Sequence, residues 1–162
     1  MRVGVCTGTF DPVTYGHLDI IRRASLLFDH VFLCVMHNPD KVPLFSVEER
    51  LEMLKHEVSD IHNVTVETYS GLAVEYARQK NAIALVRGLR AVMDFEFEFK
   101  LAAMNRSLNS SIETVFMMTS GKYSFISSSA VKEVAELGGD VSKWVSPHVA
   151  DALHRKFLNR ER

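Results

Sequence analysis

Short β-rich runs recur along this chain, and each is followed by a stretch with a helix-like pattern. This alternation of strands and helices predicts parallel βαβ units. Several runs are apolar at nearly every position, as in 31–36 (Val-Phe-Leu-Cys-Val-Met), which favours strands covered by helices on both faces. The expected strands are 3–6, 31–36, 63–68, 83–86 and 114–118. We therefore expect an α/β fold with a doubly wound, Rossmann-like parallel five-stranded sheet.

A chain of 162 residues is close to the usual size of one domain and can bury roughly 70% of its unfolded surface. No repeat, low-complexity segment or linker interrupts the sequence, so we expect a single domain over 1–162. Within 147–160, apolar residues recur at helical spacing, namely Val149, Ala152, Leu153 and Phe157. This spacing predicts a C-terminal helix that docks on the rest of the fold.

Charge and hydropathy exclude several classes of partner. The net charge is −1 with acidic and basic residues interspersed, which gives no general surface for nucleic acid or membranes. No segment approaches the ~20 apolar residues needed to span a bilayer, and the N-terminus lacks a signal-peptide core, so we expect a soluble cytoplasmic protein. Cys6 and Cys34 lie in apolar runs without metal-ligand spacing and are expected to be buried free thiols.

Ligands of doubly wound sheets bind outside the carboxyl ends of the strands, so the residues after each run are the first candidates. The first such segment, 8–17, reads Gly-Thr-Phe-Asp-Pro-Val-Thr-Tyr-Gly-His and leads into a helix expected to start at Gly16. Glycines allow close backbone approach, and a helix N-terminus with His17 in its first turn offers N–H groups to an anion. We expect a nucleotide here, and the alternative is a plain strand-to-helix turn.

Cationic residues follow two further strands. Lys41 lies in the loop after the second strand, and Arg87 and Arg90 follow the fourth. Planar guanidinium groups at a strand end can grip phosphate oxygens with paired N–H donors. The alternative is that both arginines are solvated or paired with acidic residues of the next segment, namely Asp94, Glu96 or Glu98.

After the fifth strand, three serines at 127–129 open a stretch with the pattern of an amphipathic helix. Their hydroxyl and N–H groups can cap the helix, bind the phosphates of a nucleotide, or do both. Tyr123 lies just before them and either stacks on a base or is an ordinary half-buried loop aromatic.

Two further segments are less charged. The third strand ends in 68–76, a loop and helix start whose backbone donors would suit an amide-bearing organic substrate. In the helix-like stretch 91–108, three phenylalanines are expected to pack in a core or a subunit contact rather than to bind ligand, namely Phe95, Phe97 and Phe99.

Taken together, the runs 8–17, 87–90 (Arg-Gly-Leu-Arg) and 126–129 (Ile-Ser-Ser-Ser), with Lys41, closely resemble the bacterial phosphopantetheine adenylyltransferase family over almost the whole chain. The run 14–17 (Thr-Tyr-Gly-His) is similar to the (Thr/His)-x-Gly-His element of the wider nucleotidyltransferase superfamily. The resemblance implies transfer of an adenylyl group from ATP to 4'-phosphopantetheine, which gives dephospho-coenzyme A and pyrophosphate. It also implies Mg²⁺ with the ATP and a cytoplasmic homohexamer.

The resemblance further implies residue roles. Phosphopantetheine would be contacted by Thr9, Lys41, Ala73 through its backbone, and Arg87. The implied ATP contacts are Thr9, Phe10, His17, Gly88, Leu89, Arg90, Glu98, Tyr123, Ser124, Phe125, Ile126, Ser127, Ser128 and Ser129. Catalysis would rest on His17, Lys41 and Arg90, and no residue is assigned to a metal. The chain departs from the family at Cys6 and Thr7, where an aromatic residue and a proline are usual.

A phosphate monoester is a competent nucleophile at neutral pH, so this chemistry needs alignment of two polyanions rather than an activating base. We expect His17, Lys41 and Arg90 to stabilise the charged transition state without a covalent intermediate. We expect the serines at 127–129 to hold the β- and γ-phosphates.

Three alternatives remain open from the sequence. The first is a related nucleotidyltransferase with another phosphate-bearing acceptor, because the run 14–17 does not distinguish acceptors. The second is a non-catalytic nucleotide-binding or regulatory module. The third is a structural or interaction protein, which leaves the polar residues at the strand ends unexplained.

Overall fold

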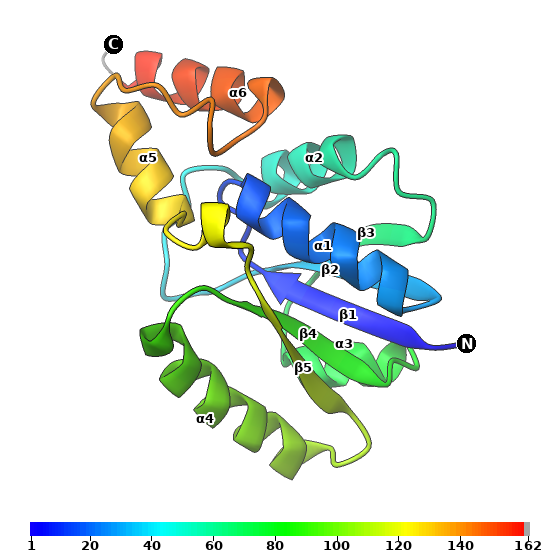
Figure 1. Ribbon diagram of the computed structural model, residues 1–162. Coiled ribbons are helices and arrows are strands. Elements are labelled where there is room, and N and C mark those ends of the chain that lie inside the picture. The colour runs from blue at the N-terminus through cyan, green and yellow to red at the C-terminus, as the bar shows by residue number, and fades with distance from the viewer. Residues whose placement is uncertain (161–162) are drawn as a thin grey trace.

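Five parallel strands form the centre of the computed structural model, which describes residues 1–160 (Figure 1). They span Val3–Gly8 (β1), His30–Met36 (β2), Val64–Tyr69 (β3), Ala84–Leu89 (β4) and Glu113–Met118 (β5). Their order in the sheet is β3-β2-β1-β4-β5, and every neighbouring pair is parallel. The predicted doubly wound five-stranded sheet is confirmed.

Two strands extend by at least two residues beyond the carboxyl ends that the sequence predicts. β1 continues to Gly8, and β4 continues to Leu89, so Arg87 and Gly88 lie inside the strand rather than after it. Tertiary pairing explains the difference, because β4 stays in register with β5 as far as Leu89 and Met118. The cationic side chain of Arg87 is therefore held on a regular strand, not on a loop.

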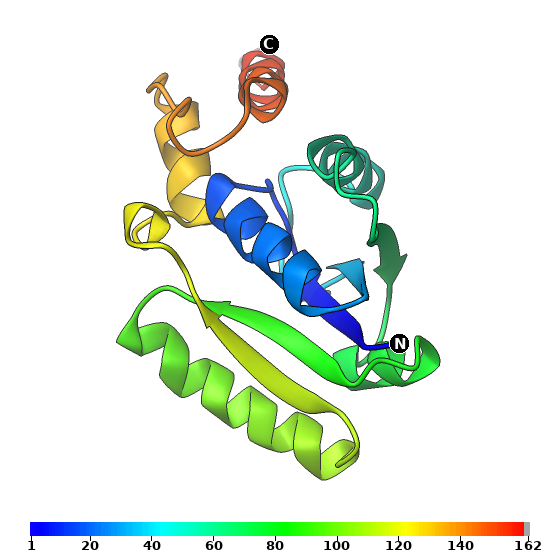
Figure 2. The ribbon, with the colours of Figure 1, turned by 45° about the vertical axis from the view of Figure 1, so that its right-hand side comes forward.

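Helices cover both faces of the sheet, as Figures 1 and 2 show. One face carries the helices Tyr15–Leu27 (α1) and Val47–Glu57 (α2), and the other carries Ala73–Gln79 (α3) and Val92–Leu108 (α4). The short 3₁₀ turn Gly121–Tyr123 (η1) leads to Ser128–Glu136 (α5) and to the C-terminal helix Pro147–Leu158 (α6). The predicted arrangement, with a C-terminal helix, is thus present.

Apolar strand residues alternate between the two layers. In β2, Val31, Leu33 and Val35 pack in the core beneath α1 and α2, while Cys34 packs in the core on the side of α3. Because both sets are almost completely buried, the strand is apolar at successive positions, as expected for a sheet with two covered faces.

The C-terminal helix docks as predicted. Ser146 caps α6 by accepting a hydrogen bond from the N–H of Val149, and Val149 and Leu153 are buried in the main core. The predicted single domain also includes positions 161–162, which lie outside the described residues, so its full extent stays a prediction.

Both cysteines are buried free thiols, as the sequence predicts. Burial raises the pKa of Cys6 and of Cys34 to about 12, which keeps both side chains protonated at neutral pH. Among the described residues, no helix has the length and apolar character required to cross a membrane.

Truncation of Leu153 tests the docking of α6. Leu153→Ala is expected to lower the free energy of unfolding by about 2–5 kcal/mol, because it empties a fully buried site. The matched control is Leu158→Ala on the same helix, where the side chain is 49% exposed and the expected cost is below about 0.5 kcal/mol. Urea denaturation measures both, and equal losses would contradict the packing described.

Candidate active site

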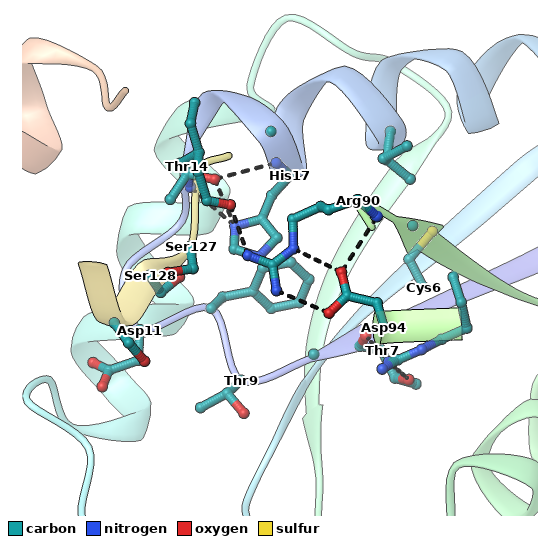
Figure 3. A pocket seen from close by; sticks show the side chains of 18 of the residues that line it. Cys6, Thr7, Thr9, Asp11, Thr14, His17, Arg90, Asp94, Ser127 and Ser128 are labelled. Atoms are coloured by element: carbon teal, nitrogen blue, oxygen red, sulfur yellow. Dashed lines mark hydrogen bonds and ion pairs between the residues drawn. The ribbon is translucent and has the colours of Figure 1, made fainter. Parts of the chain in front are cut away.

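A cavity of about 580 Å³ lies at the carboxyl end of the sheet, where the strand order reverses between β1 and β4. This is the position at which doubly wound sheets bind their ligands. It brings together most of the residues singled out from the sequence, namely Thr9, Phe10, His17, Lys41, Arg87, Gly88, Arg90, Glu98, Ile126, Ser127, Ser128 and Ser129. Figure 3 shows how several of these side chains gather around it.

The imidazole of His17 is held by the start of α1, which begins at Tyr15, one residue earlier than predicted. Thr14 caps the helix, and its side chain accepts a hydrogen bond from the N–H of His17. In return the N–H of Thr14 donates to Nδ1 of His17 at 3.0 Å. Because Nδ1 accepts this hydrogen bond, the proton of the neutral ring lies on Nε2, which is thereby a hydrogen-bond donor.

The environment keeps His17 neutral. Burial, followed by the positive charges of Arg90 and Arg87, lowers the pKa of His17 to about 4. The ring of Phe10 packs edge-on against the imidazole, with 5.1 Å between ring centroids. In the protein without ligand, His17 is therefore held in one orientation as a neutral hydrogen-bond donor.

Arg87 is bound on several sides. Its Nε and Nη2 donate to the two carboxylate oxygens of Glu98 at 2.9 and 2.7 Å, and its Nη1 donates to the carbonyl of Thr7 at 2.7 Å. The hydroxyl of Thr7 accepts a further hydrogen bond at 3.2 Å. Thr7, one of the two positions at which the sequence departs from the family that it resembles, thus helps to orient this arginine.

Arg90 is also paired. Its Nε lies 3.2 Å from Asp94, and its Nη1 donates to the carbonyl of Ile126 just before α5. The ion pairing of both arginines, which the sequence left as an alternative, is thus confirmed, while their contact with phosphate stays a prediction. Lys41 is exposed on the cavity wall, in the turn that follows Asn38.

The N-terminus of α5 faces the cavity. The side chain of Ser127 caps the helix by accepting from the N–H of Ala130, and the hydroxyl of Ser128 donates to the carbonyl of Pro12. The predicted capping role is confirmed, and the helix N-terminus adds partial positive charge to the cavity wall. Phosphate binding by these serines stays a prediction.

Four predicted ATP-contact residues do not line this cavity. Leu89 is buried in β4, and Tyr123 packs beside Tyr15 and the main core, as in the half-buried alternative. Phe125 is exposed against Trp144 and Ser124 bonds within its own turn. Their contacts with ATP stay predictions.

Ala73 lines a second, smaller cavity of about 150 Å³ on the other side of Arg87. The two cavities share the side chains of Thr7, Arg87 and Glu98 in their walls. The two cavities are therefore neighbours that meet at Arg87 and Glu98.

Three charged residues of the main cavity were given no role by the sequence reasoning: Asp11, Arg50 and Lys132. Asp11 forms an ion pair with Lys132, with 2.8 Å between the carboxylate oxygen and Nζ. The side chain of Arg50 is buried, with 1% of the residue exposed. The signal for Arg50 was present, since it lies on the buried stripe of α2 with Met53 and Leu54, where an arginine requires a polar partner.

A cavity at the reversal of strand order, lined by helix N-termini and cationic side chains, is the typical ligand site of a doubly wound α/β protein. A family model described as cytidylyltransferase-like matches residues 5–134. The phosphopantetheine adenylyltransferase of Caldanaerobacter subterraneus subsp. tengcongensis is 54% identical over 157 residues, which are 97% of this chain and 98% of that protein. The chain therefore belongs to the phosphopantetheine adenylyltransferase family of the cytidylyltransferase-like nucleotidyltransferases.

Solved structures agree on the fold. A putative nicotinate-nucleotide adenylyltransferase from Vibrio parahaemolyticus superposes with a TM-score of 0.73 at 19% identity, over 100% of this chain and 98% of that one. The nicotinic acid mononucleotide adenylyltransferase of Plasmodium falciparum, complexed with NaAD, gives 0.71 at 15% identity, over 95% of each chain. At these identities the likeness concerns the architecture alone.

A pH titration of His17 tests the environment described. Since folding lowers its pKa from 6.5 to about 4, the imidazole is expected to stay neutral, with the proton on Nε2, from pH 8 down to about pH 5. The unfolded chain binds the additional proton between these pKa values, so His17 destabilises the fold as the pH falls from 6.5 towards 4. Nitrogen-15 NMR of the ring measures both tautomer and pKa, and a pKa near 6.5 would contradict the assignment.

Proposed function

We propose that this protein transfers the adenylyl group of ATP to 4'-phosphopantetheine and releases dephospho-coenzyme A and pyrophosphate. The observation that carries the proposal is the 54% identity, over nearly the whole chain, to a phosphopantetheine adenylyltransferase. The cavity supports it, because it gathers cationic and N–H donors around a space large enough for two phosphate-bearing ligands.

The proposed step is a direct in-line displacement. An oxygen of the acceptor phosphate attacks the α-phosphorus of ATP, and the bond from this phosphorus to the oxygen that bridges to the β-phosphate breaks. Pyrophosphate carries away the electron pair, and the enzyme forms no covalent bond. The cysteine in the cavity wall is unsuited to compete as a nucleophile, since Cys6 is a buried thiol whose pKa is raised to about 12.

His17 is proposed to act through its Nε2–H. As negative charge grows on the α-phosphate oxygens, a neutral donor already fixed by Thr14 and Phe10 can stabilise it without reorientation. Lys41 and Arg90 are proposed to add positive charge on either side of the same phosphate. We assign the β- and γ-phosphates to the N-terminus of α5 with Ser127, Ser128 and Ser129.

Arg87 is proposed to bind the phosphate of phosphopantetheine with Thr9 and Lys41. The ion pair with Glu98 fixes the plane of this guanidinium, which reduces the conformational entropy lost when a ligand binds. From Arg87 the pantetheine arm would run into the smaller cavity, where backbone groups near Ala73 can meet its amides.

Magnesium is proposed to enter with ATP as part of the substrate. The described part of the chain has no cluster of three or more potential metal-ligating side chains. The three carboxylates of the main cavity are each paired with a cation: Asp11 with Lys132, Glu98 with Arg87 and Asp94 with Arg90. A magnesium ion held by phosphate oxygens and water fits such a site better than one in a protein cage.

An assembly of copies is also proposed. Apolar side chains of α4 point to solvent, with Met93 87% exposed and Phe97 66% exposed, so these residues are not part of the core of the chain. An apolar surface of this kind is typical of a protein contact, which supports the predicted homohexamer. The number six and the cytoplasmic location rest on the family resemblance.

Acceptor choice tests the function directly. With ATP and magnesium, pyrophosphate release is expected with 4'-phosphopantetheine but not with nicotinamide mononucleotide, glycerol 3-phosphate or pantetheine that lacks the phosphate. Release with one of the other acceptors would retain the nucleotidyltransferase class and overturn the acceptor. ATP binding without release would favour a regulatory module.

Removal of the His17 imidazole tests its role. His17→Ala is expected to lower kcat by about 10²–10³, the usual cost of one preorganised donor, while the Kd for ATP changes little. The control is His154→Ala, an exposed histidine of α6 away from the cavity, which is expected to retain wild-type turnover. Near-normal kcat in His17→Ala would remove His17 from the mechanism.

A further inference from the structure

Phe10 has a strained backbone at the rim of the active cavity. Its φ of 49° lies in the left-handed region, which is unfavourable for a residue with a bulky side chain. Such a conformation persists only where the surroundings hold it in place. The residues on either side of Phe10 are both anchored: Asp11 to the segment between β2 and α2, and Thr9 to Arg50 within α2.

Asp11 anchors one side. Its carboxylate is 4% exposed and accepts the backbone N–H groups of Phe45 and Leu44, each at 2.9 Å. Leu44 and Phe45 end the loop that carries Lys41. A side chain of the first loop thus binds the backbone of the second.

Arg50 anchors Thr9, on the other side of Phe10, and it does so as a hydrogen-bond donor where Asp11 is an acceptor. Its Nη1 donates to the carbonyl of Thr9 at 2.9 Å, and its Nε donates to the carbonyl of Phe45 at 3.1 Å. It also donates to the carbonyls of Met36 and Ser46, so both ends of the Lys41 loop meet one guanidinium. Within residues 1–160, all hydrogen bonds of this buried arginine go to backbone carbonyls.

We propose that Asp11 and Arg50 form a reciprocal clamp that fixes the Lys41 loop against Thr9 and so positions the acceptor phosphate for attack. Both are positioning residues, because they act through Thr9 and Lys41 and not on the substrate. The proposal rests on the proposed function, in which Thr9 and Lys41 bind the acceptor.

The clamp makes a specific kinetic prediction. A small shift of the acceptor relative to the α-phosphorus can cost about 10²-fold in rate, even when the change lies outside the chemistry. Arg50 joins the Lys41 loop to Thr9 only, whereas Asp11 also reaches α5 through its ion pair with Lys132. Loss of the Arg50 side of the clamp should therefore impair use of the acceptor far more than binding of ATP, while loss of Asp11 also disturbs α5.

Two conservative variants test the clamp. Asp11→Asn keeps the size of the side chain but replaces one acceptor oxygen by an NH₂ donor. This donor then faces another donor, either a backbone N–H or the ammonium group of Lys132. Arg50→Lys keeps the charge but loses the planar fork that reaches several carbonyls. Each is expected to lower kcat/KM for 4'-phosphopantetheine about 10²-fold at saturating ATP. For Arg50→Lys, which leaves the Asp11–Lys132 pair intact, the Kd for ATP from calorimetry is expected within about threefold of wild type.

Coupling and a structural control complete the kinetic test. If the two residues act as one unit, the double variant should lose little more activity than either single variant. Tyr76→Phe is the matched control. Tyr76 is 2% exposed and lies in α3 outside both cavities, and the substitution removes the hydrogen bond that its hydroxyl donates to Glu67. It should lower stability and leave both kinetic constants unchanged.

Hydrogen exchange on the wild-type protein keeps the test independent of how the variants fold. The amides of Leu44 and Phe45 lie in a loop, yet the clamp predicts that they exchange slowly because Asp11 holds them. Fast exchange of these amides, or equal losses for ATP and acceptor in Arg50→Lys, would overturn the clamp. Absence of pyrophosphate release by the wild-type protein would instead overturn the proposed function, and slow exchange would then still support the contact itself.

Discussion

The parallel pairing of β1 with β4 is the constraint on which the site depends. Gly4, Val5 and Cys6 pair with Ala84, Leu85 and Val86, so strands far apart in sequence become neighbours at the centre of the sheet. The chain winds outward in both directions from this pair, and the loops at its carboxyl end therefore diverge and leave a cavity. This pairing brings His17, which follows β1, and Arg90, which follows β4, close together in space although they are far apart in the sequence.

The cavity is built to receive negative charge mainly with donors that are already held in place. Arg87 and Arg90 are paired with carboxylates, His17 is neutral, and the N-termini of α1 and α5 add only partial charges. Each of these donors is held by a second interaction, so little reorganisation of them is needed when a polyanion binds. Lys41, which is exposed, and Arg50, which bonds to backbone carbonyls, add full positive charge to the cavity wall. This arrangement is typical of catalysis by alignment and electrostatic stabilisation.

The sheet and much of the site could be predicted from the sequence, because they follow from the pattern of neighbouring residues. Apolar runs predicted the strands of the sheet. Because ligands bind at the carboxyl ends of such strands, the positions of His17, Lys41 and Arg90 after three of the runs predicted that they lie around one cavity. The clamp could not be predicted, since Asp11 and Arg50 gain their meaning only from backbone groups that tertiary folding brings to them. The same holds for the true end of β4, which its pairing with β5 determines.

The central claim is that the protein aligns two phosphates and contributes no nucleophile of its own. The most direct test is the stereochemical course at the α-phosphorus, followed with one diastereomer of ATP that carries sulfur on this phosphorus and with 4'-phosphopantetheine as acceptor. A single in-line displacement predicts inversion of configuration in the dephospho-coenzyme A product. Retention of configuration would require two displacements through a covalent enzyme intermediate and would contradict the account.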